Sequence, residues 1–461
     1  MGLLEVAFDK FRVYEALKKV VGNHGAAGVD GMPADEEAKQ WVAGHLDEIV
    51  SSVLDGSYRP LPARRVYIPK ANGKKRPLGI PTVVDRTVQQ AMATALSGVY
   101  DRHFSPHSHG FRPGRSCATA MEEALGYLNE GYTWIVDLDI EKFFDTVNHD
   151  RLISIVRERV NESGTLRLIR SFLRAGVMDD GLVKATDMGT PQGAPVSPVL
   201  SNIYLDQLDK ELESRGLRFV RYADDCNIFV GSKEAAERVM RSITGWLERK
   251  LFLKVSAEKT KVVPPNKGQF LGFTYWKDGT TKEWKCRPQE SRKQRLKDKV
   301  KEVTIRRRAV AVPLGVTFKK LNLIVKGWIN YYSIGSMKRF LQEEFGPWLR
   351  HKVRVVIVKQ WKYPPTIYRN LSKLNRMFKG NFTDEVLYAT ANARLGWYRK
   401  SRLQAVNYLL SPAVLAIPKV EGKGKDAKVV REGLVNPLDY YLTILSKKEK
   451  EPKGSRKVST M

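Results

Sequence analysis

Two adjacent carboxylates in FVRYADDCNIFV, residues 219–230, are the side chains of this chain best suited to holding a divalent cation. Apolar and β-branched residues flank Asp224 and Asp225 on both sides, a pattern that predicts two strands joined by a short turn. Neighbouring ionised carboxylates repel each other, and a bound cation relieves this repulsion. The alternative for an Asp-Asp pair taken alone is a solvated turn, because Asp is an ordinary turn residue.

A second group of acids lies in TWIVDLDIEKFFDTVNHDRL, residues 133–152. Residues 135–140 alternate in the manner of a strand, so Asp137 and Asp139 are expected on one face of it. Acids at the end of an apolar strand are unfavourable unless they pair with a cation, although an Asp there can also cap a helix. A strand that lies beside the Asp224 turn would bring Asp139 to a shared metal site.

A loop rich in small residues opens GTPQGAPVSPVLSNIYLDQLD, residues 189–209. Its glycines and prolines exclude regular structure at the start, and residues 199–208 then carry a helical apolar period. Such a loop lets the backbone and Gln192 approach a nucleotide closely. Alone, this is a weak signal.

The segments around these motifs mix helices and strands, which predicts an α+β sheet domain that positions the acids. Helical patterns cover residues 84–100, 118–128, 151–175, 199–208 and 233–250, and strand-like patterns cover 252–256, 259–263 and 269–275. After Tyr275 the pattern changes to long basic helices at residues 292–308, 318–332 and 348–361.

Positive charge is concentrated in the last two-fifths of the chain. Residues 1–280 contain 38 basic and 36 acidic residues, whereas residues 281–461 contain 41 and 14. A neutral body followed by a cationic region is typical of a protein that holds nucleic acid, and basic residues interleaved with aromatic rings suit RNA. The alternative is that the rings form a helical core and the lysines solvate it. The candidate RNA contacts here are Lys319, Lys320, Lys326, Trp328, Tyr331 and Tyr332.

Basic residues also gather in two places in the first half. Residues 59–76 hold seven basic residues and no acid, and predict a hairpin whose Arg64 and Arg65 meet phosphates, or else a charged edge that prevents aggregation. Arg112 and Arg115 flank a Pro-Gly turn and are candidates for gripping phosphate. The nearby His103, His107 and His109 lack a cysteine or carboxylate at ligand spacing, which argues against a metal site among them.

Composition excludes several classes of protein. Three cysteines, Cys117, Cys226 and Cys286, are far apart and form no CxxC pair, so neither a disulfide framework nor a thiolate zinc site is expected. The first residues resemble neither a signal nor a transit peptide, and no stretch reaches about 18 apolar residues. We expect a cytoplasmic protein that does not bind membranes.

In order along the chain, these motifs resemble the successive blocks of a reverse transcriptase, and specifically of the group II intron-encoded reverse transcriptase/maturase family. The blocks are the basic hairpin, HGFRPGRS at 109–116, VDLDIEKFFD at 136–145, GTPQGAPVSPVLSNIYLDQLD, FVRYADD at 219–225, AEKTK at 257–261 and FLGF at 270–273. IVKGWINYY at 324–332 and VKQWKYPPTIYRNLSKL at 358–374 resemble that family's thumb and maturase domain.

The resemblance implies a right-hand polymerase followed by a helical domain. It implies an N-terminal extension at 1–62, fingers and palm with an antiparallel palm sheet at 63–280, and a basic helical thumb/maturase domain at 281–461. We expect residues 422–428 to be a flexible insertion and residues after Ser446 a disordered basic tail.

The activity implied is RNA-directed DNA polymerisation by two-metal nucleotidyl transfer, together with binding of structured intron RNA for splicing and retrohoming. Asp139, Asp224 and Asp225 would hold two Mg²⁺ ions, for which Mn²⁺ could substitute. Partners would be an RNA template, a DNA or RNA primer, dNTPs and intron RNA, with monomer or dimer left open. The resemblance assigns to the nucleotide site Lys70, Arg76, Ile140, Phe144, Gln192 and Ala223, with Phe144 as the steric gate against a 2′-hydroxyl.

Two alternatives to this function stay open. One is a group II-like reverse transcriptase that a host uses in defence or DNA repair, and the other is an RNA-binding splicing factor whose polymerase fold is only a scaffold. A Cys/His-rich endonuclease segment is missing after the maturase-like part, so we do not expect this chain to cut a second DNA strand.

Overall fold

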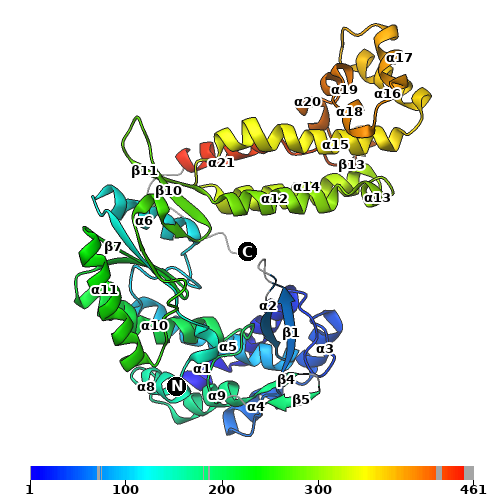
Figure 1. The fold of residues 1–461 in the computed structure, drawn as a ribbon. Helices are drawn as coiled ribbons and strands as arrows, with labels where there is room; N and C mark the ends of the chain where they lie inside the picture. Colours follow the sequence, from blue (N-terminus) through cyan, green and yellow to red (C-terminus); the bar gives the residue numbers. More distant parts are fainter. Residues whose placement is uncertain are drawn as a thin grey trace. The chain divides into compact units, whose positions relative to one another are not determined.

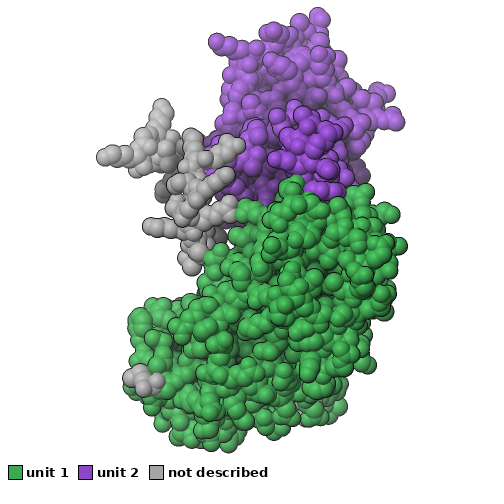
Figure 2. Space-filling view, turned by 90° about the vertical axis from the view of Figure 1, so that its left-hand side faces the viewer, with its two compact units in different colours: residues 1–271, 460 green, residues 272–459, 461 purple. Residues whose placement is uncertain are grey.

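The computed structural model describes residues 2–69, 73, 75–179, 181–184, 187–421 and 428–450. The chain divides into two compact units, with the boundary between Leu271 and Gly272 (Figure 2). The first unit mixes helices and two sheets, and the second is mainly helical (Figure 1). The predicted mixed α+β architecture with a helical C-terminal region is therefore confirmed.

The N-terminal region of the first unit is helical. Its helices are α1 (Leu3–Ala7), α2 (Lys10–Gly22), α3 (Glu36–Gly44) and α4 (Leu46–Asp55). Asp9 and Asp35 cap α2 and α3, since the Asp9 side chain accepts hydrogen bonds from two main-chain N–H groups of the first turn and the Asp35 side chain accepts one. The apolar faces of α2, α3 and α5 (Val83–Tyr100) form a small core around Leu17, Val42 and Val83.

A four-stranded sheet follows, with strand order β2-β1-β4-β5. Its strands are β1 (Ala63–Pro69), β2 (Lys75–Ile80), β4 (Val177–Asp179) and β5 (Leu182–Lys184). Strands β1 and β2 pair antiparallel, with Arg64 opposite Ile80 and Pro69 opposite Lys75, which is the predicted basic hairpin. Lys70 and the rest of the ANGKK turn, apart from Gly73 and Lys75, lie outside the described residues.

A second four-stranded sheet, of order β6-β7-β3-β8, carries the predicted acids. Its strands are β3 (Trp134–Leu138), β6 (Arg218–Tyr222), β7 (Asp225–Val230) and β8 (Lys261–Val263). The hairpin predicted around the Asp-Asp pair is β6 and β7, which pair antiparallel. The strand predicted at 252–256 is wrong, because that segment makes only an isolated bridge between Val255 and Ile140.

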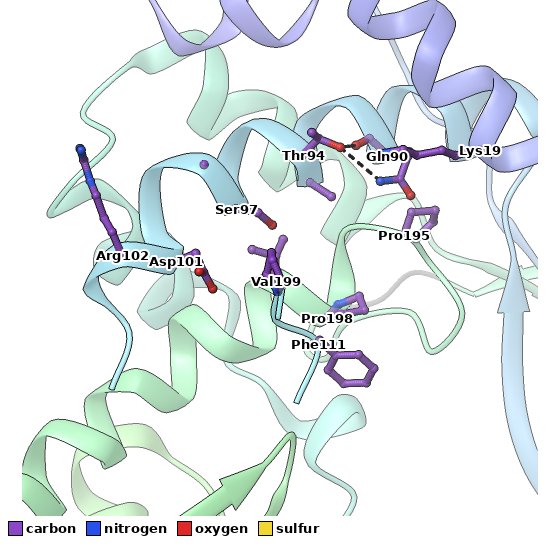
Figure 3. A pocket seen from close by; sticks show the side chains of 13 residues that line it. Lys19, Gln90, Thr94, Ser97, Asp101, Arg102, Phe111, Pro195, Pro198 and Val199 are labelled. Atoms are coloured by element: carbon purple, nitrogen blue, oxygen red, sulfur yellow. Dashed lines mark hydrogen bonds between the residues drawn. The ribbon is translucent and has the colours of Figure 1, made fainter. Parts of the chain in front are cut away.

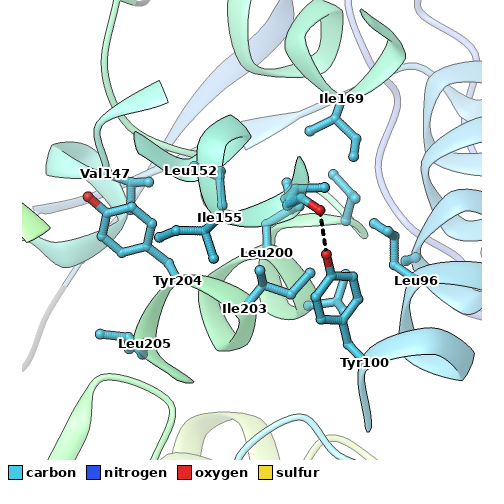
Figure 4. Packing of buried hydrophobic residues seen from close by; sticks show 14 of the residues in the cluster. Leu96, Tyr100, Val147, Leu152, Ile155, Ile169, Leu200, Ile203, Tyr204 and Leu205 are labelled. Carbon is cyan, nitrogen blue, oxygen red and sulfur yellow. Dashed lines mark hydrogen bonds between the residues drawn. The ribbon is translucent and has the colours of Figure 1, made fainter. Parts of the chain in front are cut away.

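The helices of this unit pack on this sheet or on one another and form the main core. After α5 they are α6 (Cys117–Asn129), α7 (Phe143–Thr146), α8 (His149–Arg157), α9 (Ser163–Arg174), α10 (Ser197–Ser214) and α11 (Lys233–Trp246). The unit also contains 3-10 helices at Asp101–His103 and Pro265–Lys267, a π-helix at Leu247–Leu251 and a last strand, β9 (Gln269–Phe270). Figure 4 shows Leu96 and Tyr100 facing Leu200 and Ile203, and the Tyr100 hydroxyl donates to the Val156 carbonyl at 2.8 Å. Apolar burial here anchors the helix that follows the Gln192 loop.

The second unit begins with the hairpin β10 (Phe273–Lys277) and β11 (Trp284–Pro288). Long helices follow, and Figure 1 shows α16 to α20 gathered at one end of α15. The helices and remaining strands are α12 (Glu290–Val303), α13 (Arg306–Ala309), α14 (Leu314–Tyr332), a π-helix (Phe340–Phe345), α15 (Gly346–Trp361), α16 (Pro364–Met377), α17 (Asp384–Asn392), α18 (Trp397–Lys400), α19 (Gln404–Leu409), α20 (Pro412–Ala416), β12 (Lys419–Glu421), β13 (Lys428–Arg431) and α21 (Pro437–Lys450).

The predicted start of the C-terminal tail is wrong. Helix α21 continues past Ser446 to Lys450, because it packs on this unit: the Tyr441 hydroxyl donates to Gly335 O at 2.9 Å and Lys448 Nζ to Ser333 Oγ at 2.9 Å. The insertion predicted at 422–428 falls, except for Lys428, outside the described residues. Among the described helices, none is both long and apolar enough to cross a membrane.

Candidate active site

The register of the second sheet brings the two groups of acids together. Strand β3 pairs antiparallel with β7, with Asp137 opposite Asn227 and Leu138 opposite Cys226. Continuing this register by one pair places Asp139 opposite Asp225 at the end of the sheet. On the other side of β3, Asp137 lies opposite Lys261. The acids predicted on one strand face thus meet the acids of the turn.

The turn that holds Asp224 is a two-residue connection between β6 and β7. Tyr222 pairs with Asp225, which leaves Ala223 and Asp224 as the central residues. Ala223 has a φ of 57°, in the left-handed region that a residue with a side chain rarely adopts. This strain has to be offset by contacts around the turn.

The carboxyl groups of this cluster raise one another's pKa. Partial removal from water, followed by repulsion from Asp224 and Asp139, raises the pKa of Asp225 to about 6. The same causes, with Asp225 as the main repelling neighbour, raise the pKa of Asp137 to about 7. Burial and Asp139 also raise the pKa of Asp224. The cluster therefore holds more negative charge than its surroundings balance.

Cationic side chains at the rim offset part of this charge. Lys259 Nζ lies 2.9 Å from Asp139 Oδ1 and 3.1 Å from Oδ2, and this hydrogen bond raises the pKa of Lys259. Arg76 is close enough to lower the pKa of Asp224 against the effect of burial.

The donor set fits Mg²⁺. Carboxylate oxygens are the ligands that Mg²⁺ prefers. Burial raises the pKa of Asp225 and Asp224 most, and repulsion by neighbouring carboxylates, which a cation would relieve, adds to the rise. Within the described residues, no three His, Cys, Asp or Glu side chains converge closely enough to enclose a metal ion. Mg²⁺ is commonly held by one or two carboxylates together with waters and substrate phosphates, so an open set of acids suits it.

Three of the predicted nucleotide residues, Arg76, Phe144 and Gln192, lie near one another. Arg76 Nε donates to Gln192 Oε1 at 2.9 Å, and Gly79 N donates to Gln192 O at 2.8 Å, so β2 and the 189–193 loop are bound together. A cavity of about 320 Å³ lies here, lined among others by Arg65, Phe144 and Gln192. Ile140 and Ala223 are both buried, and Lys70 lies outside the described residues.

Two glycines let the 189–193 loop approach its neighbours. Gly189 and Gly193 have φ values of 91° and 109°. A Cβ at Gly189 would lie 2.8 Å from Phe144 O, and one at Gly193 would lie 2.7 Å from Gly79 O. Any larger residue would push the loop away from Phe144 or from β2.

The predicted phosphate-gripping arginines of the first unit have protein partners. Arg64 donates twice to Ala27 O, at 2.6 and 2.9 Å. Arg112 donates to Asp101 Oδ1 at 2.7 Å and to three main-chain carbonyls, so its guanidinium braces the loop after α5. Arg115 donates to Pro106 O at 2.6 Å. Arg65, in contrast, lines the 320 Å³ cavity.

Two of the histidines in the loop before α6, His107 and His109, bind the carboxylate of Glu123. Glu123 on α6 accepts from His107 Nδ1, from His109 Nε2 at 2.6 Å and from the Tyr127 hydroxyl at 2.8 Å. Although burial opposes it, these hydrogen bonds lower the pKa of Glu123 to about 2, and Glu123 raises the pKa of His107. These hydrogen bonds hold the loop against α6.

A larger cavity of about 620 Å³ lies between α2, α5, the 109–116 loop and the start of α10. Figure 3 shows Thr94 and Ser97 of α5 inside its lining, with Lys19 and Arg102 on opposite sides and the Phe111 ring at its lower edge. Phe111 is 54% exposed and has a φ of 58°. The residue before it, Gly110, packs directly on the Ala223 turn.

The predicted RNA contacts of the second unit lie on α14 and differ in exposure. Lys319, Lys320 and Tyr331 are exposed, whereas Lys326 and Trp328 are half-buried. Lys326 Nζ lies 5.8 Å from the Tyr440 ring. Tyr332 is only 6% exposed and packs on Trp328 and Phe273, an interior position that leaves little ring surface for a base.

Sequence reasoning missed four residues that support the acids. Lys259 binds Asp139, Gly110 packs on the turn, and Arg221 and Asp209 form an ion pair with both side chains 0% exposed. All four stood inside recognised motifs, but membership in a motif does not reveal which residue a side chain contacts.

Two protein-family models match this chain. A model described as reverse transcriptase (RNA-dependent DNA polymerase) matches residues 68–275, and one described as group II intron, maturase-specific domain matches residues 293–375. The chain is also 36% identical over 299 residues to Protein YkfC of Escherichia coli (strain K12), an alignment that covers 56% of this chain and 78% of YkfC. The chain belongs to the group II intron-type reverse transcriptases, which combine a reverse transcriptase and a maturase domain.

Two other similarities cover a smaller share of the matched protein. The group II intron-encoded protein LtrA of Lactococcus lactis subsp. cremoris is 32% identical over 326 residues, which cover 56% of this chain and 54% of LtrA. A chain of a solved structure, the partial Cas6-RT-Cas1–Cas2 complex, gives a TM-score of 0.35 at 21% identity, covering 54% of this chain and 43% of that chain. That structural likeness is too small to carry an argument. As a member of this family, the chain is a reverse transcriptase, an RNA-directed DNA polymerase.

Proposed function

We propose that the chain copies RNA into DNA by two-metal nucleotidyl transfer at Asp139, Asp224 and Asp225, and that its second unit binds structured intron RNA to assist splicing and mobility. The observation that supports the first part is the β3–β7 register, in which Leu138 lies opposite Cys226, so that Asp139 follows the end of β3 where Asp225 begins β7 beside the Asp224 turn. A cluster of this kind without a catalytic role would be an electrostatic cost to the fold.

Each acid has a distinct place in the reaction. Asp139 follows the last residue of β3, Asp225 begins the neighbouring strand β7, and Asp224 lies in the turn before it. When bound, Mg²⁺ or Mn²⁺ would lower the pKa of the primer 3′-hydroxyl and neutralise charge on the triphosphate during in-line displacement of pyrophosphate. Lys259 holds Asp139 in place before the substrates arrive.

The Arg76–Gln192 pair is our candidate for contacting the incoming nucleotide. The amide of Gln192 orients the guanidinium of Arg76, which keeps donors for a triphosphate near Asp224. Phe144 lines the adjacent 320 Å³ cavity, where its ring would exclude a 2′-hydroxyl. Ile140 and Ala223 would line the site, and Lys70, which follows β1 in the sequence, would add a second cation.

The 620 Å³ cavity is a candidate path for a nucleic-acid strand to the acids. Small side chains on α5 leave room for a sugar-phosphate chain, Lys19 and Arg102 supply positive charge, and the exposed Phe111 ring can stack on a base. Because Gly110 touches the catalytic turn, a strand held at Phe111 would be delivered close to it.

We assign residues 1–62 to an N-terminal extension, 63–280 to fingers and palm, and 281–461 to the thumb/maturase region. The maturase-specific match at 293–375 and the exposed Lys319 and Lys320 of α14 support an RNA-binding role for that region. Its partners would be intron RNA, an RNA template and a DNA or RNA primer.

Primer extension tests the proposal. The full chain should extend a primer on an RNA template with dNTPs and Mg²⁺, and Asp224→Ala should stop extension while RNA binding persists. Persistent extension by Asp224→Ala would refute the assignment of the acids. If the wild-type chain binds intron RNA and promotes splicing but never extends a primer, the polymerase fold is a scaffold.

A further inference from the structure

A buried arginine directly behind the catalytic turn uses all of its hydrogen-bond donors. Arg221, on β6, is 0% exposed. Its Nε and Nη2 donate to the two oxygens of Asp209 at 2.6 and 2.5 Å, Nη2 also donates to Ser108 Oγ at 2.8 Å, and Nη1 donates to Asn202 Oδ1 at 3.1 Å and to Ala223 O at 2.9 Å. A guanidinium has five N–H donors, and each has an acceptor here.

The acceptors come from three different segments. Asp209 and Asn202 lie on α10, Ser108 lies in the loop before α6, and Ala223 is the first residue of the turn. The main chain adds to this connection, because His109 N donates to Arg221 O at 2.8 Å and Arg221 N donates to His107 O at 2.9 Å. Asn202 Nδ2 also donates to Gly110 O at 2.8 Å. Arg221 therefore joins the helix, the loop and the turn at one point.

The bond to Ala223 O bears on the orientation of Asp224. That carbonyl belongs to the peptide group that links Ala223 to Asp224, so fixing it fixes the plane from which Asp224 extends. Ala223 is held in a strained left-handed conformation, and strain of this kind persists only where neighbouring contacts impose it. Among the described residues, the Arg221 guanidinium donates the side-chain hydrogen bond that reaches this carbonyl.

We propose that Arg221, paired with Asp209, is a positioning residue that holds the Ala223–Asp224 peptide so that Asp224 and Asp225 face Asp139. This inference rests on the proposed function of the three acids. A positioning role distinguishes the Arg221–Asp209 pair from an ordinary buried ion pair, whose loss would change only the stability of the fold.

The discriminating variant is Arg221→Lys, because lysine keeps the charge but has three donors and no fork to bind Asp209, Ser108 and Ala223 together. We expect kcat for dNTP addition to fall by about tenfold or more, the Mg²⁺ concentration for half-maximal rate to rise severalfold, and the Kd for primer–template to stay within about twofold. The control is Tyr100→Phe, which removes the buried bond to Val156 O in the same unit without touching the turn. It should lower the unfolding temperature and leave kcat and the Mg²⁺ requirement unchanged.

Two further variants keep the test decisive if Arg221→Lys does not fold at the assay temperature. The pair Arg221→Met with Asp209→Leu removes both charges, and Ser108→Ala removes a single acceptor; a fall in kcat with a raised Mg²⁺ requirement in either supports the proposal. Wild-type kcat and Mg²⁺ dependence in folded Arg221→Lys, or in these variants, would overturn it. An inactive wild-type chain would instead refute the proposed function itself.

Discussion

Gly110 offers a direct way to displace the catalytic turn without altering any acid. A Cβ at this position would lie closer than 3.0 Å to Ala223 N, 3.0 Å from Tyr222 C and 3.1 Å from Ala223 Cα, whereas ordinary contact begins at 3.4 Å. All three atoms belong to the main chain, so no flexible side chain can yield. Gly110→Ala must therefore move the turn or the 109–116 loop by about 0.4 Å or more.

That displacement sets the expected size of the effect. Catalytic groups must be held within about 0.5 Å, and a misplacement of about 1 Å costs about 100-fold, so we expect kcat to fall by about 10-fold to 100-fold. Overpacking of this kind lowers the free energy of unfolding by about 1–3 kcal/mol. Single-turnover addition of one dNTP to a primer on an RNA template measures the first quantity, and urea unfolding measures the second.

Gly126→Ala is the matched control. Gly126 lies on α6 and has no neighbouring atom within 4 Å of an added Cβ, so alanine there should stabilise the helix slightly and leave kcat unchanged. If Gly110→Ala folds and adds nucleotide at the wild-type rate, the turn does not need the support that we attribute to this loop.

Three further outcomes are expected. Phe144→Ala should raise the ratio of kcat/KM for ribonucleotides to that for deoxynucleotides, and an unchanged ratio would remove the steric-gate role. Glu123 has a folded pKa of about 2, below its ordinary value of 4.5, so its stabilising effect is complete above about pH 4.5 and is lost as the pH falls toward 2. Urea unfolding between pH 6 and 3 should therefore show a shallower loss for Glu123→Gln than for wild type, and equal slopes would contradict this. Reversing the charges of Lys319 and Lys320 should weaken RNA binding and lower the slope of log Kd against log salt by about 1.5–2, whereas an unchanged slope would place the RNA elsewhere.

The fold class and the hairpin of the acids were predictable because both depend on local patterns. Alternation around Asp224 and along residues 135–140 defines β6, β7 and β3, and the helical period defines α5 and α10. The strand predicted at 252–256 failed because its alternation is not matched by a full partner strand. The β-propensity of a segment does not show whether a neighbouring strand is available for it to pair with.

The support around the acids was not predictable, because it depends on tertiary contacts. Arginine is a residue type that often binds phosphate, yet the guanidinium of Arg112 donates its hydrogen bonds to Asp101 and to nearby main-chain carbonyls. Arg221 looks like any basic residue of a strand until its five acceptors, drawn from three segments, are seen together. Tyr332 shares a motif with exposed Tyr331 but faces the interior. Sequence patterns identify which residues can do chemistry, and the fold decides which of them are free to do so.

Asp139 provides the most direct test of the central claim, because it comes from β3 rather than from the Asp224 turn. Single-turnover incorporation of one dNTP by Asp139→Asn, an almost isosteric change, should be slowed by about 1,000-fold or more, with primer–template affinity within about twofold of wild type. Incorporation within about tenfold of the wild-type rate would contradict the assignment of Asp139, Asp224 and Asp225 as one catalytic centre.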